Sequence, residues 1–258
     1  MLVATWNVNS LKARLPRVEP WLEQVAPDVV CLQETKLADP AFPTMAFTAL
    51  GYESVHHGQG QWNGVAILSR VGIDDPVAGF ADGIEADPDA RLVSATCGGV
   101  RVHSVYVPNG RSVGHDHYHY KLSWLGRLRR HLDQTCADTD DVIVAGDWNI
   151  IPGDLDVWDP AEFEGSTHVT PEERARLDEV KQWGLVDTFR DRYGDSPGLF
   201  SYYDYTAGRF HKRQGIRIDY LLASPSLAER SVLDVIDRNA RKGTKPSDHA
   251  PVLAGYAG

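Results

Sequence analysis

Long apolar runs are absent from this 258-residue sequence. No segment approaches the roughly 20 consecutive apolar residues that a membrane-spanning helix needs, so we expect no membrane partner. The N-terminus also lacks the basic and apolar regions of a secretory signal peptide. Interdomain linkers and internal repeats are missing as well, which predicts a single domain over residues 1–258.

Cysteine is scarce. Cys31, Cys97 and Cys136 are an odd number and lack CxxC spacing. Cys31 falls inside an apolar run, so we expect reduced thiols and a cytoplasmic protein. The alternating histidines between residues 115 and 119 could indicate zinc, but without nearby cysteine they are weak evidence for a metal site.

Positive charge is in deficit, with 26 Lys and Arg against 36 Asp and Glu and a net charge of −10. A nucleic-acid-binding protein needs Lys and Arg to neutralise phosphates, but the local distribution of charge decides the field. Each basic cluster here is equally well explained as a solvated face. The first, third and fourth clusters adjoin polar segments described below, which favours a basic rim around an acidic centre. The clusters are Lys12, Arg14 and Arg17; Arg127, Arg129 and Arg130; Arg209, Lys212, Arg213 and Arg217; and Arg238, Arg241, Lys242 and Lys245.

A polar tetrapeptide follows the apolar run at residues 142–145. This run, bounded by acidic residues before it and by Gly146 after it, predicts a buried strand. Because side chains alternate along a strand, Asp147 and Asn149 should leave its end on the same side. A carboxylate that can take a proton beside an amide that can donate hydrogen bonds suits water activation next to a phosphate.

Other strand-like runs also end in polar residues. Any one of these residues is better explained as a turn cap, but their joint occurrence favours a site built on rigid strand ends. Residues 2–6 lead into Asn7, 28–32 into Gln33 and Glu34, 100–105 into Tyr106 and then Asn109, and 216–218 into Asp219, while Asp248 and His249 precede a last strand at 251–254.

Helical periodicity appears between these strands. Apolar residues at helical spacing predict an amphipathic helix over residues 14–26, with Pro16 in its first turn. A leucine repeat between residues 122 and 132 marks a second helix, with Lys121 on its polar side. Strands that alternate with helices are typical of α/β folds.

A third helix has the clearest start signal: Thr170 as N-cap, Pro171 at the first position and Glu173 completing a capping box. Residues 92–107 predict a hairpin that turns at Gly98 and Gly99. Two strand-rich halves with helices outside predict an α/β four-layer sandwich, in which two packed mixed β-sheets are flanked by helices.

The polar motifs together closely resemble those of the bacterial exonuclease III branch of the endonuclease/exonuclease/phosphatase superfamily. LQET, GDxN and SDH are specific for the superfamily, and RIDYLLAS with KPSDHAPV narrows the resemblance to this branch. The match runs in order along essentially the whole chain. It is carried by residues 6–14, 32–36, 106–110, 146–150, 215–220 and 245–252. The resemblance implies a deoxyribonuclease I-like fold and a DNA-repair nuclease.

A metal site is expected around Glu34, because hard oxygen ligands suit Mg²⁺, for which Mn²⁺ could substitute. By analogy with the family, Asn7 and Asp248 would complete it. A surface carboxylate after a strand is the ordinary alternative for Glu34. Its place directly after a buried run disfavours that alternative.

Catalysis is assigned to a second group of residues. A carboxylate at Asp219 would fix the tautomer of His249 and raise its pKa, so that the imidazolium binds the scissile phosphate. An alternative makes the same pair a general base. Asp147 would orient and deprotonate water, Asn149 would hold that water or a phosphate oxygen, and Tyr106 would donate to the phosphate or leaving oxygen.

Double-stranded DNA with abasic sites or 3′ ends is the expected substrate, and a monomer the expected state. The aromatic segment at residues 200–205 matches the family's abasic-sugar pocket, with Tyr202 where relatives often carry Trp, although cross-strand pairing is an alternative for it. The expected DNA contacts are Asn109, Arg111, Lys121, Tyr202, Arg209, Lys212 and Ile216.

Two other functions remain open: a non-catalytic RNA-binding regulator on the same fold, and a superfamily phosphatase acting on inositol lipids or sphingomyelin. Every proposed catalytic position retains a competent residue, which disfavours the regulator. The phosphatase lacks support from membrane-binding segments.

Overall fold

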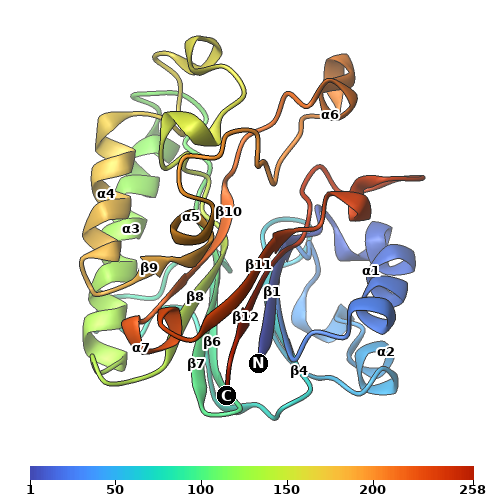
Figure 1. The fold of residues 1–258 in the computed structure, drawn as a ribbon. Coiled ribbons are helices and arrows are strands. Elements are labelled where there is room, and N and C mark those ends of the chain that lie inside the picture. The colour runs from blue at the N-terminus through green and yellow to red at the C-terminus, as the bar shows by residue number, and fades with distance from the viewer.

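The computed structural model describes residues 1–258 and contains two six-stranded sheets that pack face to face (Figure 1). The strand orders are β11-β12-β1-β2-β4-β3 and β5-β6-β7-β8-β10-β9. The pairs β1–β2 and β7–β8 are parallel and the other neighbours are antiparallel, so both sheets are mixed. The strands are β1 (Leu2–Asn7), β2 (Val29–Gln33), β3 (Glu53–His57), β4 (Val65–Ser69), β5 (Asp74–Ala78), β6 (Leu92–Cys97), β7 (Val100–Tyr106), β8 (Val142–Asp147), β9 (Val186–Asp187), β10 (Asp219–Ala223), β11 (Ser231–Ile236) and β12 (Val252–Tyr256).

Helices cover the two outer faces: α1 and α2 lie on one side of the sheets and α3 and α4 on the other (Figure 1). The α-helices are α1 (Leu11–Val25), α2 (Thr44–Ala49), α3 (Asp116–Thr135), α4 (Pro171–Lys181), α5 (Thr188–Tyr193), α6 (Arg209–Lys212) and α7 (Pro225–Ala228). Short 3₁₀ helices are η1 (Asp39–Ala41), η2 (Asp154–Asp156), η3 (Pro160–Phe163), η4 (Thr206–Gly208) and η5 (Arg238–Arg241). No helix is long and apolar enough to span a bilayer.

Alternation along the strands produces the four layers. In β8, Ile143 and Ala145 belong to the core between the sheets, whereas Val142 and Val144 pack under α3 and α4. In β2, the even-numbered residues Val30 and Leu32 belong instead to the core under α1 and α2. A sheet buried on both faces needs apolar residues at every position, which is what these runs provide. The predicted four-layer sandwich is confirmed.

Local predictions are mostly confirmed. Thr170 and Glu173 form a reciprocal capping box at the start of α4. The hairpin β6–β7 turns at Gly98 and Gly99, both with positive φ. The backbone at these two positions therefore adopts the conformation that a tight hairpin turn requires.

Two of the boundaries that differ from the sequence-based expectation lie next to the polar strand ends. Helix α1 begins at Leu11 rather than at residue 14, so Pro16 lies beyond its first turn. The expected strand at residues 216–218 is not part of the sheet: β10 begins at Asp219, and Ile216 forms isolated bridges to Val157 and Tyr202. Ile216 is thereby placed beside the site instead of within the core of the sheet.

The strand register brings polar ends together at one edge of the molecule. Asn7 is opposite Gln33, which precedes Glu34, in the first sheet. Asp147 is opposite Tyr106 on one side and Asp219 on the other in the second sheet. A Cβ at Gly146 would lie 1.9 Å from the carbonyl oxygen of Val105, so this strand end requires glycine.

Candidate active site

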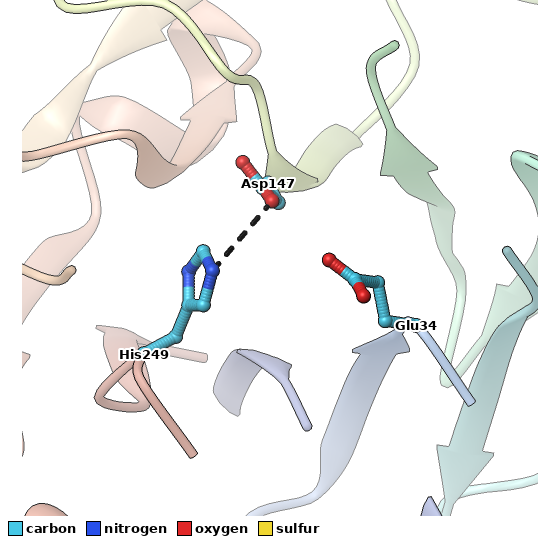
Figure 2. A group of neighbouring side chains, drawn as sticks. All are labelled: Glu34, Asp147 and His249. Atoms are coloured by element: carbon cyan, nitrogen blue, oxygen red, sulfur yellow. Dashed lines mark ion pairs between the residues drawn. The ribbon is translucent and has the colours of Figure 1, made fainter. Parts of the chain in front are cut away.

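Three ionisable side chains from distant parts of the chain meet at this edge. Glu34 follows β2, Asp147 ends β8, and His249 precedes β12. One ligand atom from each lies within 4.8 Å of the others, and these three residues are the only such group in the structure. Figure 2 shows both carboxylates and the imidazole pointing toward one another. The predicted convergence of the strand ends is therefore observed.

Glu34 is held by donors from three directions. Its Oε1 accepts from Asn7 Nδ2 and from the Tyr106 hydroxyl, both at 2.9 Å, and its Oε2 pairs with Lys36 Nζ at 2.8 Å. Burial alone would raise the pKa of Glu34, but the hydrogen bond and charge of Lys36, together with Asn7, lower it below the ordinary value. Glu34 is therefore kept ionised.

Lys36 had no role in the sequence analysis. Its Nζ also donates to Asn9 Oδ1 at 2.6 Å. Glu34 and Lys36 both have positive φ, 51° and 53°, a conformation that non-glycine residues adopt only when the surrounding structure imposes it. The positive charge two residues after Glu34 in the LQETK segment was the available signal.

The amide of Asn7 joins the two carboxylates. Its Nδ2 donates to Asp147 Oδ2 at 2.9 Å as well as to Glu34, and its Oδ1 accepts from the Asn9 backbone N–H at 3.0 Å. Asn7 is completely buried. The nitrogen side of this amide therefore faces the carboxylates and fixes their separation.

Asp147 is buried and lies among other acids. Its Oδ1 accepts from the Asn149 backbone N–H at 2.9 Å, and its Oδ2 is 3.9 Å from His249 Nε2. Burial raises the pKa of Asp147 to about 7; the charge of His249 opposes this shift and the charge of Asp219 adds to it. A carboxylate that exchanges a proton near neutral pH suits a general base.

His249 forms the predicted pair with Asp219. Its Nδ1 lies 2.8 Å from Asp219 Oδ2, and Ser201 Oγ donates to the same oxygen at 2.7 Å. Burial lowers the pKa of His249, but the charge and hydrogen bond of Asp219 outweigh it and raise the pKa to about 10. The imidazole is therefore a cation at neutral pH, and its Nε2–H faces the side of Asp147.

The donor set fits a divalent metal ion. Glu34, Asp147 and Asp248 line one cavity, to which each contributes a carboxylate. Asp248 is half-buried, and its Oδ1 accepts from Asn9 Nδ2 at 3.1 Å. Hard oxygen ligands on an acidic cluster are what divalent cations such as Mg²⁺ or Ca²⁺ prefer.

The cavity over this cluster has a volume of about 340 Å³. Tyr202, Arg209 and Ile216, all predicted DNA contacts, line it. The Tyr202 ring lies edge-on to the His249 ring, with centroids 4.9 Å apart. These three residues are therefore positioned to contact whatever occupies the cavity.

Three further lining residues were missed by sequence reasoning: Trp158, Phe163 and His168. Trp158 and Phe163 come from the acidic segment 152–167, where two aromatic residues among acidic neighbours were the available signal. The Arg209 guanidinium lies over the Trp158 ring, with its Cζ 5.4 Å from the ring centroid. An aromatic wall thus closes one side of the cavity.

A second groove adjoins the cavity and shares Tyr106 and Asn109 with it. Asn109 Nδ2 donates to Asn149 Oδ1 at 3.2 Å, and Arg111 is exposed in the groove. Trp62, which the sequence analysis did not single out, lines the same groove with 65% of its surface exposed. Lys212 is exposed on α6, which projects beyond the sheets (Figure 1).

Lys121 does not face solvent, so its predicted contact with DNA is wrong. Its side chain is completely buried and forms an ion pair with Glu173. The expected polar side of α3 at this position is in fact the face against α4 and the Asn149 turn. His115 has a structural role, since its Nδ1 accepts from the His117 backbone N–H at 3.0 Å and caps α3.

The chain belongs to the Endonuclease/Exonuclease/phosphatase family, which matches residues 4–249. Within it, the likeness is to the exodeoxyribonuclease III type: the chain is 35% identical to exodeoxyribonuclease III of Haemophilus influenzae over 267 aligned residues, covering 99% of this chain and 100% of that protein. The resemblance found in the sequence is thereby confirmed.

Solved structures of similar proteins support the same family assignment. An AP endonuclease from Archaeoglobus fulgidus superposes with a TM-score of 0.96 at 35% identity, with 100% of both chains covered. NExo, a 3′-5′ exonuclease from Neisseria meningitidis, superposes with a TM-score of 0.95 at 35% identity and the same coverage. A further structure of NExo, described there as a 3′ phosphatase, is bound to a product DNA hairpin.

Proposed function

We propose that this protein is a Mg²⁺-dependent DNA-repair nuclease that hydrolyses phosphodiester bonds 5′ to abasic sites and trims 3′ ends of duplex DNA. The observation that carries the proposal is the meeting of Glu34, Asp147 and the Asp219–His249 pair at one cavity. Phosphodiester hydrolysis needs a water nucleophile, a base and neutralisation of charge on the phosphate, and this set of groups can supply each.

The roles follow from protonation and geometry. Because His249 is a cation at neutral pH, its Nε2–H can donate to a non-bridging phosphate oxygen. Asp147, with a pKa of about 7, can take a proton from water, and Asn149 can hold that water. The Tyr106 hydroxyl, now donating to Glu34, can donate to the leaving oxygen. Bound Mg²⁺, held by the carboxylates of Glu34 and Asp248, would supply charge neutralisation, and Asn7, predicted as a third ligand, would orient Glu34 through its amide N–H instead.

The cavity and the similar proteins support both abasic-site incision and 3′-end trimming. The cavity is large enough for a flipped deoxyribose without its base, and its wall carries Tyr202, Trp158 and Ile216 for apolar contact. The similar proteins include one described as an AP endonuclease and one described as a 3′-5′ exonuclease. We further propose that the chain acts as a cytoplasmic monomer of a single domain, on duplex DNA.

A pair of labelled duplexes tests the proposal. One carries a single internal tetrahydrofuran abasic analogue, and the other a recessed end with a 3′-hydroxyl. We expect Mg²⁺-dependent nicking directly 5′ of the analogue in the first duplex and stepwise removal of nucleotides from the recessed 3′ end in the second, with both reactions abolished by EDTA. If neither duplex is cleaved in a metal-dependent way, the proposal is wrong. Cleavage of only one duplex would show which of the two activities, abasic-site incision or 3′-end trimming, the protein has.

The two alternatives predict other results. An RNA-binding regulator would bind single-stranded RNA without cleaving either duplex. A superfamily phosphatase would release phosphate from inositol phosphates or phosphocholine from sphingomyelin. Neither alternative accounts for the 35% identity to an exodeoxyribonuclease over the full chain.

A further inference from the structure

A buried ion pair lies directly behind the candidate active site. Lys121 of α3 and Glu173 of α4 are both completely buried, and their side chains are in contact. Removing two charges from water is unfavourable, and well-packed apolar residues often replace such pairs without loss of stability. Stability alone therefore does not explain why this lysine and this glutamate are present.

Glu173 connects several elements at once. Besides Lys121, its Oε1 accepts from Thr167 Oγ1 at 2.7 Å. Its Oε2 accepts from the Thr170 backbone N–H at 3.1 Å and from Thr170 Oγ1 at 2.9 Å. The carboxylate that caps α4 is thus the same group that holds the ammonium of Lys121, so the start of α4 and the middle of α3 are locked together.

The second hydrogen-bond partner of Lys121 is Asn149, a residue of the candidate active site. Lys121 Nζ donates to the backbone carbonyl of Asn149 at 2.6 Å, and His168 Nδ1 donates to the same oxygen. Asn149 has a positive φ of 51° and is 4% exposed. A buried carbonyl needs hydrogen-bond donors, and Lys121 and His168 supply them to Asn149 from behind the site.

The conformation of Asn149 sets the arrangement in front of it. Its backbone N–H donates to Asp147 Oδ1 at 2.9 Å, and its Nδ2 donates to the Val107 carbonyl at 2.9 Å and lies 3.4 Å from Asp147 Oδ2. Its Oδ1 accepts from Asn109. A change in the φ of Asn149 would move its carbonyl and its side-chain amide together, so that the amide would turn away from Asp147 and the cavity.

We infer that Lys121 and Glu173 are positioning residues: they hold the Asn149 backbone in its left-handed conformation from behind, so that Asn149 and Asp147 remain aligned for hydrolysis. The inference rests on the function proposed above for Asn149 and Asp147 in hydrolysis. Neither Lys121 nor Glu173 touches the cavity itself, and both act through the Asn149 carbonyl.

The test uses Lys121→Met, which keeps an unbranched side chain as far as Cε but removes the donor, and Glu173→Gln, which keeps the shape of the cap. We expect kcat on the tetrahydrofuran duplex at saturating Mg²⁺ to fall about 10- to 100-fold, the loss that a displacement of about 1 Å produces, while KM changes less than about threefold. Glu173→Gln provides the result if Lys121→Met does not fold.

The matched control is Arg127→Met. Arg127 lies on the same helix, pairs with the buried Asp82 at 2.8 Å and does not line the cavity. It should lower Tm, as Lys121→Met does, and leave kcat unchanged. If Lys121→Met and Glu173→Gln reduce Tm and leave kcat at the level of this control, the pair has only a structural role and the inference is wrong.

A double-mutant cycle identifies the route of the effect. In an Asn149→Ala background, Lys121→Met should cause no further loss of kcat; full additivity would contradict the inference. The Asn149 side-chain ¹H–¹⁵N resonances should also shift in Lys121→Met and stay in place in Arg127→Met. An inactive wild type would refute the proposed function, whereas these resonances test the positioning role regardless of activity.

Discussion

At the scale of single residues, neighbouring carboxylates of the site differ in their protonation behaviour. Lys36 and Asn7 keep the pKa of Glu34 below its ordinary value, whereas burial and nearby acids raise that of Asp147 to about 7. Two carboxyl groups with pKa values displaced in opposite directions are suited to different tasks. Glu34 is suited to remain an anion that holds a cation, and Asp147 to exchange a proton.

Replacing Asp147 with Asn tests this division. The substitution keeps the shape of the side chain but removes the base, and its NH₂ group would face Asn7 Nδ2 or the Asn149 N–H, both of them donors. We expect kcat to fall about 10²- to 10⁴-fold, the usual contribution of a general base. Single-turnover nicking of the tetrahydrofuran duplex measures it.

Asp133→Asn, an exposed position on α3, serves as control and should keep wild-type activity. The role of Asp147 would be rejected by a variant that nicks within threefold of the wild type. Loss of activity accompanied by a collapse of Tm would instead indicate that Asp147 is needed for folding.

The site residues that sequence reasoning found share one property: they lie at or next to an end of an apolar strand. Glu34, Asp147 and Asp219 could be predicted because strand ends recur at one edge of a sheet. Lys121 could not be placed correctly, since its partner Glu173 is 52 positions away and only the packing of α3 on α4 buries it. His168 was missed because neither its positive φ of 85° nor its place in the cavity wall follows from local sequence.

At the scale of elements, boundaries depend on tertiary contacts. Helix α1 starts at Leu11 because the Ser10 and Leu11 N–H groups donate to the Glu34 and Thr35 carbonyls, at 2.7 and 3.0 Å. The sequence near residue 11 does not predict these partners, which lie more than 20 residues away along the chain. In contrast, the start of α4 was predictable, because Thr170 and Glu173 satisfy each other within four residues.

Helix α3 packs on β7 through a buried histidine pair, which predicts a pH-dependent stability. His131 Nδ1 accepts from the Ala81 N–H at 3.0 Å, and its Nε2 lies 3.3 Å from His103 Nδ1. Burial, and then the charge of Arg101, lower the pKa of His131 to about 4. Below pH 6.5 the unfolded chain therefore binds a proton that the folded protein does not, and stability falls between pH 6.5 and 4.

His131→Gln removes this titration while keeping an acceptor for Ala81. We expect the slope of the unfolding free energy against pH, between pH 6 and 4.5, to decrease by up to one proton, about 1.4 kcal/mol per pH unit. Urea unfolding at several pH values measures the slope. His119→Gln, exposed on the same helix, is the control. Equal slopes in all three proteins would show that His131 does not titrate this way.

At the scale of the whole molecule, the net charge of −10 conceals an uneven distribution. Arg14 reaches Tyr205 at 2.9 Å, and Arg17 donates to the carbonyls of Ala240 and Lys242. Basic clusters that lie far apart in sequence thus meet beside α6. A pocket there shares Arg209 with the candidate active site. A local positive field can steer a polyanion to a protein whose net charge is negative.

Charge reversal in the basic clusters beside α6 tests whether the local positive field or the net charge of the protein governs DNA binding. Lys212→Glu/Lys242→Glu and Arg70→Glu/Arg130→Glu change the net charge equally, and all four residues are exposed. In an Asp147→Asn background, fluorescence anisotropy at about 0.1 M salt should show the first pair binding the tetrahydrofuran duplex about tenfold or more weakly, with a shallower salt dependence, because phosphate contacts are lost. The second pair should change Kd about twofold at most. Equal weakening would mean that net charge, and not the rim, governs DNA binding.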